Sequence, residues 1–447
     1  MAFLTDSGSF AVSTGAAGTT ADITCTDAVG GTFQPKAVLL YVMGGRTEGT
    51  DAVGAAGAKC SIGFGTTGSN RYCVSSAVQH NAAAGTGSKR MSDAAIMEIL
   101  DIAGGAGIEG GLDLDTVGNW PATGFRVIVD EQFTNAYRVG WIAWGGSDIT
   151  NATCVLFQEP AATGNQDITT PGFTVTDGNG VVILISMADA TVPPAGFISG
   201  VNGRAGKMMI GAATSPTKQA VLITNDDEAS ATIDGTSYCS DILAVAMIPD
   251  TGGAVVDARA TFNAWITNGF QLNWAERVST RYIAALVIKG GKWECGNLLT
   301  QTDTTTNIVE GSFGFAPKST FVVSAQKAKD TADTAAAHDQ ISFGAFTSAS
   351  NRHCQSYLNV NGGANSVVQT AIEYDEVYAN LTTAALEGLM DVVSIDSGGF
   401  TLKMDDADPT AMFAWYVSAG ETPASVTEEV FFKQPAQVQL PCAVMAY

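Results

Sequence analysis

The sequence predicts an all-β protein made of three tandem β-sandwich or jelly-roll-like modules. One pattern, Gly-Phe followed by an alternating strand and then a mostly apolar strand, occurs three times. It occupies residues 124–146, 269–291 and 399–417, so the Gly-Phe pairs are 145 and 130 residues apart. A period of this length corresponds to a domain, because solenoid repeats span only about 20–50 residues. The 50 glycines and the low charged fraction of 15% favour short strands joined by turns.

Other blocks recur in the same order along the chain. The text FQPK at 33–36 returns as FAPK at 315–318, and SNRYC at 69–73 returns as SNRHC at 350–354. The middle copy lacks the Pro-Lys pair and carries TKQA at 217–220 in place of the second block. A chain of 447 residues is also too long for one hydrophobic core, which stops growing near about 250–300 residues. We therefore expect modules at 1–152, 153–291 and 292–447, the last with a C-terminal tail.

Within each copy, side-chain periodicity predicts the strands. Phe270, Leu272 and Trp274 alternate with polar residues, as in a strand with one buried face, and 125–129 and 400–404 alternate in step. The strand that follows is nearly all apolar, which is typical of a strand covered on both faces. We expect Phe125, Phe270 and Phe400 to be core residues.

Turn and helix signals fill in the remaining elements. The text DGNG at 177–180 predicts a hairpin between strands at 173–175 and 181–185. Apolar residues at helical spacing predict a short helix over 376–390.

Charge excludes some classes of partner. Forty-four acidic residues against 22 basic ones give a net charge of −22, and the only basic pair of note is Lys89 with Arg90. Nucleic acids and anionic membranes need clustered Lys and Arg, so neither is an expected partner. No apolar run reaches the ~18 residues of a transmembrane helix. The first residues also lack the basic and apolar regions of a signal peptide.

Sequence motifs predict no enzyme. Residues 105–110 fit G-x-G-x-x-G, but the text after them is not helical, as a dinucleotide site would require. No Ser lies in a nucleophile elbow, and the three histidines, His80, His338 and His353, form no metal pair. Acidic clusters at 225–228 and 405–408 are candidates only for a structural cation. We therefore predict no catalytic residue, no cofactor and no metal ligand.

The cysteines allow two interpretations. Cys73 and Cys354 occupy the same place in the repeat, which suggests packing. Six others do not recur in sequence and are candidates for cross-links between modules or subunits, the alternative being buried, reduced thiols. These are Cys25, Cys60, Cys154, Cys239, Cys295 and Cys442.

A resemblance rests on the recurring blocks. The text GSF at 8–10, TFQPKAV at 32–38, GFQLNW at 269–274 and the apolar strand ending in Gly-Gly at 290–291 look like a module of tailed-bacteriophage virion proteins. The resemblance implies a non-enzymatic capsid decoration, neck collar or tail-associated protein, made in the host cytoplasm. It also implies partners that are further copies of the chain and other virion proteins. The alternative is a receptor- or glycan-binding adhesin, in which Trp120 or Tyr374 would stack on sugars.

Assembly contacts are expected where the copies differ most. Segment 79–90, with Lys89 and Arg90, and the tail 421–447 have no close counterpart in the other copies. In the tail, Val430, Phe431 and Phe432 fall outside the module pattern. These five residues are the candidate contacts with other copies.

Overall fold

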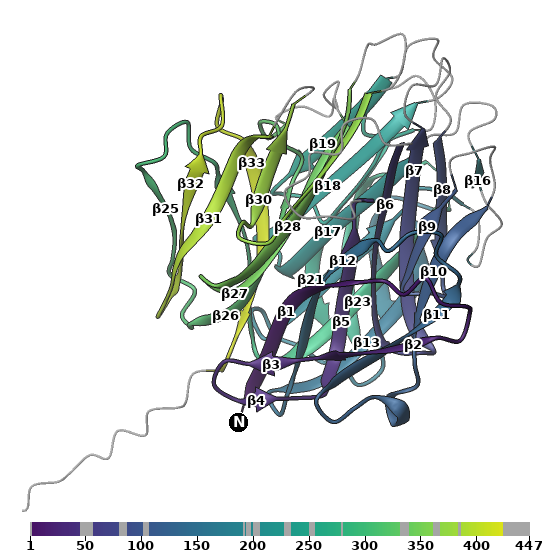
Figure 1. The fold of residues 1–447 in the computed structure, drawn as a ribbon, viewed down its shortest axis with the longest axis horizontal. Coiled ribbons are helices and arrows are strands. Elements are labelled where there is room, and N and C mark those ends of the chain that lie inside the picture. Colours follow the sequence, from purple (N-terminus) through teal and green to yellow (C-terminus); the bar gives the residue numbers. More distant parts are fainter. Residues whose placement is uncertain are drawn as a thin grey trace, which may run out of the picture.

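The computed structural model confirms an all-β fold of repeated β-sandwich units (Figure 1). It describes residues 2–44, 57–79, 87–101, 107–190, 193, 198–199, 206–227, 234–249, 255–278, 280–330, 339–360, 367–382 and 386–422. One short 3₁₀ turn, Val117–Asn119, is the only helical element in these ranges.

Unit 1 is a sandwich of an inner sheet, to which it contributes six strands, and an outer four-stranded sheet. The inner sheet has the order β1-β12-β5-β6-β7-β8-β16, in which the seventh strand, β16, comes from unit 2, and the outer sheet has the order β2-β11-β10-β9. A two-stranded ribbon, β3-β4, lies beside them. The strands are β1 Phe3–Ala11, β2 Thr20–Thr24, β3 Thr26–Asp27, β4 Gly31–Thr32, β5 Pro35–Val42, β6 Gly57–Thr67, β7 Asn70–Gln79, β8 Gly87–Ser92, β9 Met97–Leu100, β10 Ile108–Leu114, β11 Gly124–Glu131 and β12 Arg138–Gly146.

Units 2 and 3 repeat the strand order of these inner and outer sheets, without a counterpart of the β3-β4 ribbon in the described residues. Unit 2 has the inner order β13-β23-β15-β17-β18-β19 and the outer order β14-β22-β21-β20. Its strands are β13 Ile149–Gln158, β14 Gly164–Thr169, β15 Gly180–Ser186, β16 Ile198–Ser199, β17 Lys207–Ser215, β18 Lys218–Asp227, β19 Asp234–Ser240, β20 Val245–Met247, β21 Ala258–Ile266, β22 Gly269–Glu276 and β23 Tyr282–Gly290. Unit 3 has the inner order β24-β33-β26-β27-β28-β29 and the outer order β25-β32-β31-β30. Its strands are β24 Lys292–Leu299, β25 Asn307–Glu310, β26 Pro317–Ser324, β27 Asp339–Ser348, β28 Asn351–Val360, β29 Val367–Glu373, β30 Tyr378–Leu381, β31 Leu386–Asp396, β32 Gly399–Asp406 and β33 Phe413–Gly420.

Three expectations about the elements are wrong. The boundary at 152/153 falls inside β13, which pairs with β23 along its length, so unit 2 begins with β13. Segment 376–390 is not a helix, because it supplies β30 and the start of β31, which pair with each other. Residues 173–175 form no strand, and β15 pairs instead with β17 and β23.

Each sandwich has its own core between the inner and outer sheets. Phe125, Phe270 and Phe400 are all 0% exposed and lie in these three cores, as predicted. The glycine before each Phe is required by close packing. A Cβ on Gly124, Gly269 or Gly399 would lie 1.8–2.0 Å from a carbonyl oxygen of β2, β14 or β25. This explains why the Gly-Phe pair recurs.

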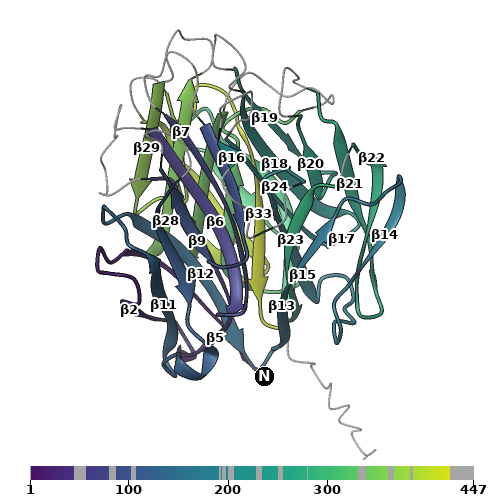
Figure 2. The same cartoon turned by 90° about the vertical axis from the view of Figure 1, so that its right-hand side faces the viewer.

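A fourth core joins the three units. The inner sheets turn their second faces toward one another, so that β12, β23 and β33 are buried on both sides. In β23, for example, Ile283, Ala285 and Val287 pack in the sandwich of unit 2, whereas Ala284, Leu286 and Ile288 pack in the shared core. The outer sheets lie at the periphery, with β25, β32 and β31 at the left of Figure 1 and β14, β22 and β21 at the right of Figure 2.

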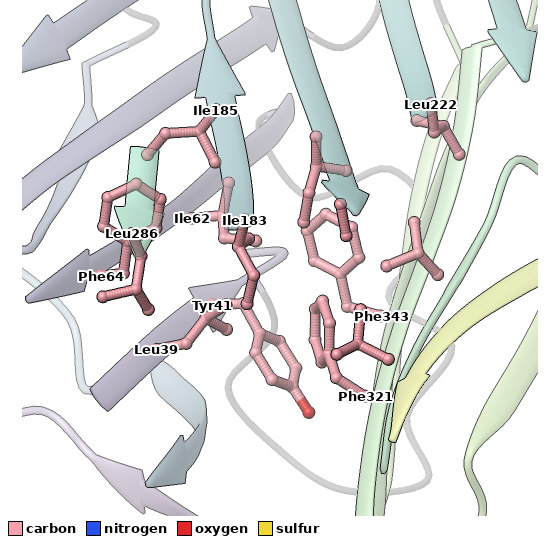
Figure 3. Packing of buried hydrophobic residues seen from close by; sticks show 14 of the residues in the cluster. Leu39, Tyr41, Ile62, Phe64, Ile183, Ile185, Leu222, Leu286, Phe321 and Phe343 are labelled. Carbon is pink, nitrogen blue, oxygen red and sulfur yellow. The ribbon is translucent and has the colours of Figure 1, made fainter. Parts of the chain in front are cut away.

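Figure 3 shows side chains of all three units meeting in this shared core. Tyr41 of unit 1 lies against Phe321 and Phe343 of unit 3, with ring centroids 5.7 and 5.8 Å apart. The labelled residues come from unit 1 (Leu39, Tyr41, Ile62, Phe64), unit 2 (Ile183, Ile185, Leu222, Leu286) and unit 3 (Phe321, Phe343). The three sandwiches therefore form one body and not a string of separate domains.

A shared core predicts cooperative unfolding. We expect Leu286→Ala to lower the free energy of unfolding by about 2–5 kcal/mol, as for other buried Leu truncations. Because the same core supports every unit, the whole chain should melt in one calorimetric transition that moves as a unit. Val309→Ala, at a side chain that is 67% exposed, is the control and should change little. Separate transitions, of which only one responds to Leu286→Ala, would contradict the shared core.

Candidate functional site: the seams between the units

The three units contact one another in a closed cycle. The first strand of each unit packs against the central strands of the unit before it. Strand β13 contacts β6 and β7, β24 contacts β17 and β18, and β1 contacts β27 and β28. The third contact closes the ring between unit 3 and unit 1. The chain is therefore a pseudo-threefold assembly made by one polypeptide.

A polar residue at the start of β7, β18 and β28 anchors each seam. Asn70 receives a hydrogen bond from Cys154 N at 2.7 Å and donates one to Cys154 O at 3.1 Å, so it holds the backbone of β13. The residue in this place in unit 2 is Lys218, whose Nζ lies 2.5 Å from the Glu294 carboxylate of β24. In unit 3 it is Asn351, which donates to Asp6 of β1 at 3.0 Å. The same position thus serves the same role with three chemistries.

The recurring Pro-Lys pair also lies at the seams. Lys36 Nζ donates to Ile149 O at 2.5 Å, and Lys318 Nζ donates to Phe3 O at 2.9 Å, each reaching the beginning of the next unit's first strand. At the remaining seam, whose unit lacks Pro-Lys, the direction is reversed, and Lys292 of β24 donates to Asn179 at 2.7 Å. Sequence reasoning found the pair but not its role.

The seam between units 3 and 1 has an additional buried contact. The ring of His353 stacks on Tyr41 with centroids 5.6 Å apart, and neither ring nitrogen has a hydrogen-bond partner among the described residues. Burial lowers the pKa of His353 to about 3, so the imidazole is neutral. Next to it, Gln355 accepts from Met43 N at 2.9 Å and donates to Arg138 O at 3.1 Å. Units 3 and 1 are not consecutive in the chain, so noncovalent contacts such as these hold this seam together.

Lys89 and Arg90 are not surface contacts, contrary to expectation. The Lys89 side chain is 0% exposed, and its ammonium lies 3.4 Å from Asp189, which follows β15 of unit 2. Strand β16 of unit 2 also pairs with β8 at Lys89. Arg90 is paired with the buried carboxylate of Glu98 at 2.6 Å. Lys89 therefore belongs to a seam inside the chain. Val430, Phe431 and Phe432 lie outside the described residues.

An edge contact of the same kind occurs between units 2 and 3. Asp330, after β26, donates its backbone N–H to Cys239 O at 3.2 Å and accepts from Cys239 N at 2.8 Å. The segments after β15 and β26 thus cover the edge strands β8 and β19 of the preceding units. Covering an edge strand prevents it from pairing with another chain.

The cysteine cross-links are not supported by the structure. Cys25, Cys60, Cys154, Cys239 and Cys295 are all buried, and Cys442 lies outside the described residues. Burial raises the pKa of the Cys25, Cys154 and Cys295 thiols, and that of Cys239 to about 12. Strand pairing also places Cys154, opposite Leu286, in the same position as Cys295, opposite Val417. Both face the preceding unit, so this recurrence, like that of Cys73 and Cys354, reflects packing.

The remaining candidate residues are mostly structural. Trp120 is 5% exposed and donates to Asp115 O at 2.8 Å, so it is not an exposed aromatic. Tyr374 is half-buried under the Arg138 guanidinium, 5.6 Å from the ring centroid. In the 405–408 cluster, Asp408 is buried and accepts from Asn380 at 2.9 Å and Tyr378 at 3.1 Å. Of the glycine-rich 105–110 text, residues 108–110 belong to strand β10, and 105–106 lie outside the described residues.

Within the described ranges, no group of three or more His, Cys, Asp or Glu side chains is arranged to hold a metal ion. Nor do these ranges contain a helix long and apolar enough to cross a membrane. Comparison with protein-family models and with curated proteins found no match for this chain.

Burial of His353 predicts acid sensitivity at one seam. The unfolded chain takes up a proton near pH 6.5 that the folded chain refuses until about pH 3, so stability falls as the pH drops through this window. We expect His353→Phe to remove roughly 2 kcal/mol of the loss between pH 7 and pH 5. Urea unfolding of both proteins at each pH measures it. Above pH 7 the difference between them should not vary with pH, and equal acid sensitivity would contradict the assignment.

Burial of the thiols predicts that they do not react in the folded protein. In a Cys442→Ser background, a thiol reagent should label no cysteine of the native chain and all of them in denaturant, because thiolate formation is suppressed at buried sites. Mass spectrometry of the labelled chain gives the count. Rapid native labelling of Cys154 or Cys239 would show that the seams open.

Proposed function

We propose that this chain is a non-enzymatic structural component of a bacteriophage virion that supplies a preassembled threefold block. The observation that carries the proposal is the closed ring of three like units around one core. Triplication gives the chain an approximate threefold arrangement, because three related outer sheets face outward from one body. The resemblance of the repeated blocks to virion modules supports the same class of function.

The proposal includes many copies on a symmetric particle, as a capsid decoration, neck collar or tail-associated protein. A partner with threefold or local threefold symmetry would meet three similar surfaces on this chain. The net charge of −22 opposes association of free chains in solution. Contacts on the particle must therefore come from uncharged surfaces or from basic groups of other virion proteins. The adhesin alternative loses Trp120, one of the two aromatics on which it relied.

Purified particles provide the test. We expect the chain in stoichiometric amounts in particles, and a density with three similar lobes placed on a symmetric feature in a cryo-EM map. The purified protein should be a monomer in solution by native mass spectrometry and blank in glycosidase, esterase and peptidase assays. Absence from purified particles would refute the virion role, and a turnover abolished by one Ser or carboxylate substitution would refute the non-enzymatic one.

A further inference from the structure

One corner of the sandwich is built differently in the three units. Three positions meet there. They are the start of β6 or its equivalents β17 and β27, the residue before β12 or its equivalents β23 and β33, and the first residues at or before β10 or its equivalents β21 and β31, which we call the β6-type, β12-type and β10-type strands. Strand registers identify the equivalent residues, with Gly63, Gly211 and Gly344 as the reference positions. A Cβ on any of these glycines would lie 1.9–2.1 Å from a carbonyl oxygen. The β10-type strands carry the same register shift in all three units. The corner residues are Lys59, Glu109 and Tyr137 in unit 1, Lys207, Asp257 and Arg281 in unit 2, and Gln340, Glu387 and Met412 in unit 3.

In unit 1 this corner is filled by a charged network. Lys59 Nζ forms an ion pair with Glu109 and lies 3.2 Å from the Tyr137 hydroxyl. The same hydroxyl donates to Glu109 at 2.5 Å. The side chains of Lys59 and Glu109 are only 11% and 8% exposed. A cation on an aliphatic stem therefore occupies the space and neutralises the carboxylate.

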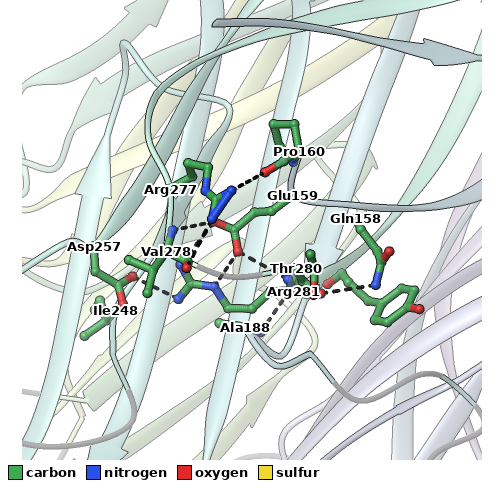
Figure 4. A network of polar contacts seen from close by, with 12 residues as sticks. Gln158, Glu159, Pro160, Ala188, Ile248, Asp257, Arg277, Val278, Thr280 and Arg281 are labelled. Carbon is green, nitrogen blue, oxygen red and sulfur yellow. Dashed lines mark hydrogen bonds and ion pairs between the residues drawn. The ribbon is translucent and has the colours of Figure 1, made fainter. Parts of the chain in front are cut away.

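In unit 2 the same corner holds two cations, Lys207 and Arg281, and Figure 4 shows the contacts of Arg281. Arg281 pairs with Glu159 at 2.7 Å and with Asp257 at 2.9 Å, and its side chain is 6% exposed. Lys207, 1% exposed, donates to Ile248 O at 2.5 Å. Here too the carboxylate at the start of the β10-type strand, Asp257, is satisfied by a basic side chain from within the chain.

In unit 3 the cations are missing and the corner is open. Gln340 replaces the lysine and Met412 replaces the arginine or tyrosine, and a cavity of about 420 Å³ is found there. Polar residues Gln340, Asn380 and Glu387 and apolar residues Leu358, Leu381 and Met412 line it.

Acceptor oxygens remain available in this cavity. Gln340 donates through Nε2 to Leu381 O at 3.3 Å, and Asn380 donates through Nδ2 to Asp408, which leaves their carbonyl oxygens without a donor among the described residues. Glu387 is exposed and has no ion pair within that part of the chain. Lys327 is the one basic residue among the described residues that line the cavity, and its Nζ is paired with Asp330 at 2.6 Å and donates to Ser237 O at 2.7 Å.

We propose that this cavity of unit 3 binds a lysine or arginine side chain of a partner protein. The other two units show what the corner accepts, namely an ammonium or guanidinium group on an aliphatic stem beside a carboxylate. In unit 3 the stem would lie along Leu358, Leu381 and Met412, and the cationic group would donate to Gln340 Oε1, Asn380 Oδ1 and Glu387. The acidic chain as a whole attracts a basic partner. The proposal does not depend on the virion role.

The test follows the Met412 methyl signal of the full chain by NMR with methyl-labelled methionine, assigned with Met412→Leu. We expect saturable shifts with N-acetyl-arginine amide or N-acetyl-lysine amide and none with the neutral analogues citrulline amide and norleucine amide. Gln340→Lys, which restores the cation of unit 1, should abolish the shifts and raise the melting temperature. Glu387→Gln should weaken binding several-fold, whereas Glu131→Gln, at an exposed carboxylate of unit 1, should not.

Several results would overturn the proposal. These are the absence of a saturable Met412 shift, equal shifts from arginine and citrulline amides, or unchanged binding in Glu387→Gln. Glu387 is exposed, so this substitution should leave the fold intact. Shifts with spermidine but with neither amino-acid amide would overturn the assignment to a protein side chain. Should Gln340→Lys fail to fold, the Glu387 and Glu131 variants still decide the outcome.

Discussion

Burial of the three inner sheets on both faces is the constraint on which the rest of the structure depends. A single sandwich of this kind would leave one apolar face of its inner sheet in water. Val181, Ile183 and Ile185, for example, belong to the shared core and not to the sandwich core of unit 2. Burial of apolar surface is the dominant favourable term in folding, so each unit needs the other two. The ring is thus a condition of the fold and not an arrangement added to finished domains.

This constraint explains which features of the fold could be predicted from the sequence. Periodicity within a strand is a local signal, so the Gly-Phe strand and the doubly buried strand after it were predicted correctly. Which surface covers the second face is a long-range fact, and no local pattern states that β33 and β12 share a core. For the same reason the role of Lys36 and Lys318 at the seams could not be predicted, although the recurring Pro-Lys pair was visible. Segment 376–390 was misread because its apolar spacing suits a helix, whereas pairing with neighbouring strands decides its conformation.

Loop lengths hid the other equivalences. Cys154 and Cys295 are separated by 141 residues, whereas the Gly-Phe pairs of units 2 and 3 are separated by 130. A fixed offset therefore fails, and only strand register shows that the two cysteines share a position. The same is true of Tyr137, Arg281 and Met412, whose side chains have nothing in common in sequence. The cavity of unit 3 becomes visible as an exception only when the filled corners of units 1 and 2 are placed beside it.

A single chain also permits what three identical subunits would not. In a homotrimer all seams must be alike. Here Asn70 hydrogen-bonds the backbone of β13, Lys218 forms an ion pair and Asn351 donates to a carboxylate. Once the units are joined, each seam needs only to match its own partner, and residues at equivalent positions are free to diverge. His353 stacked on Tyr41 at the one seam without a covalent link is a product of that freedom. The open corner of unit 3 is another product of this divergence. An open corner in every unit would deprive the fold of three buried polar networks instead of one.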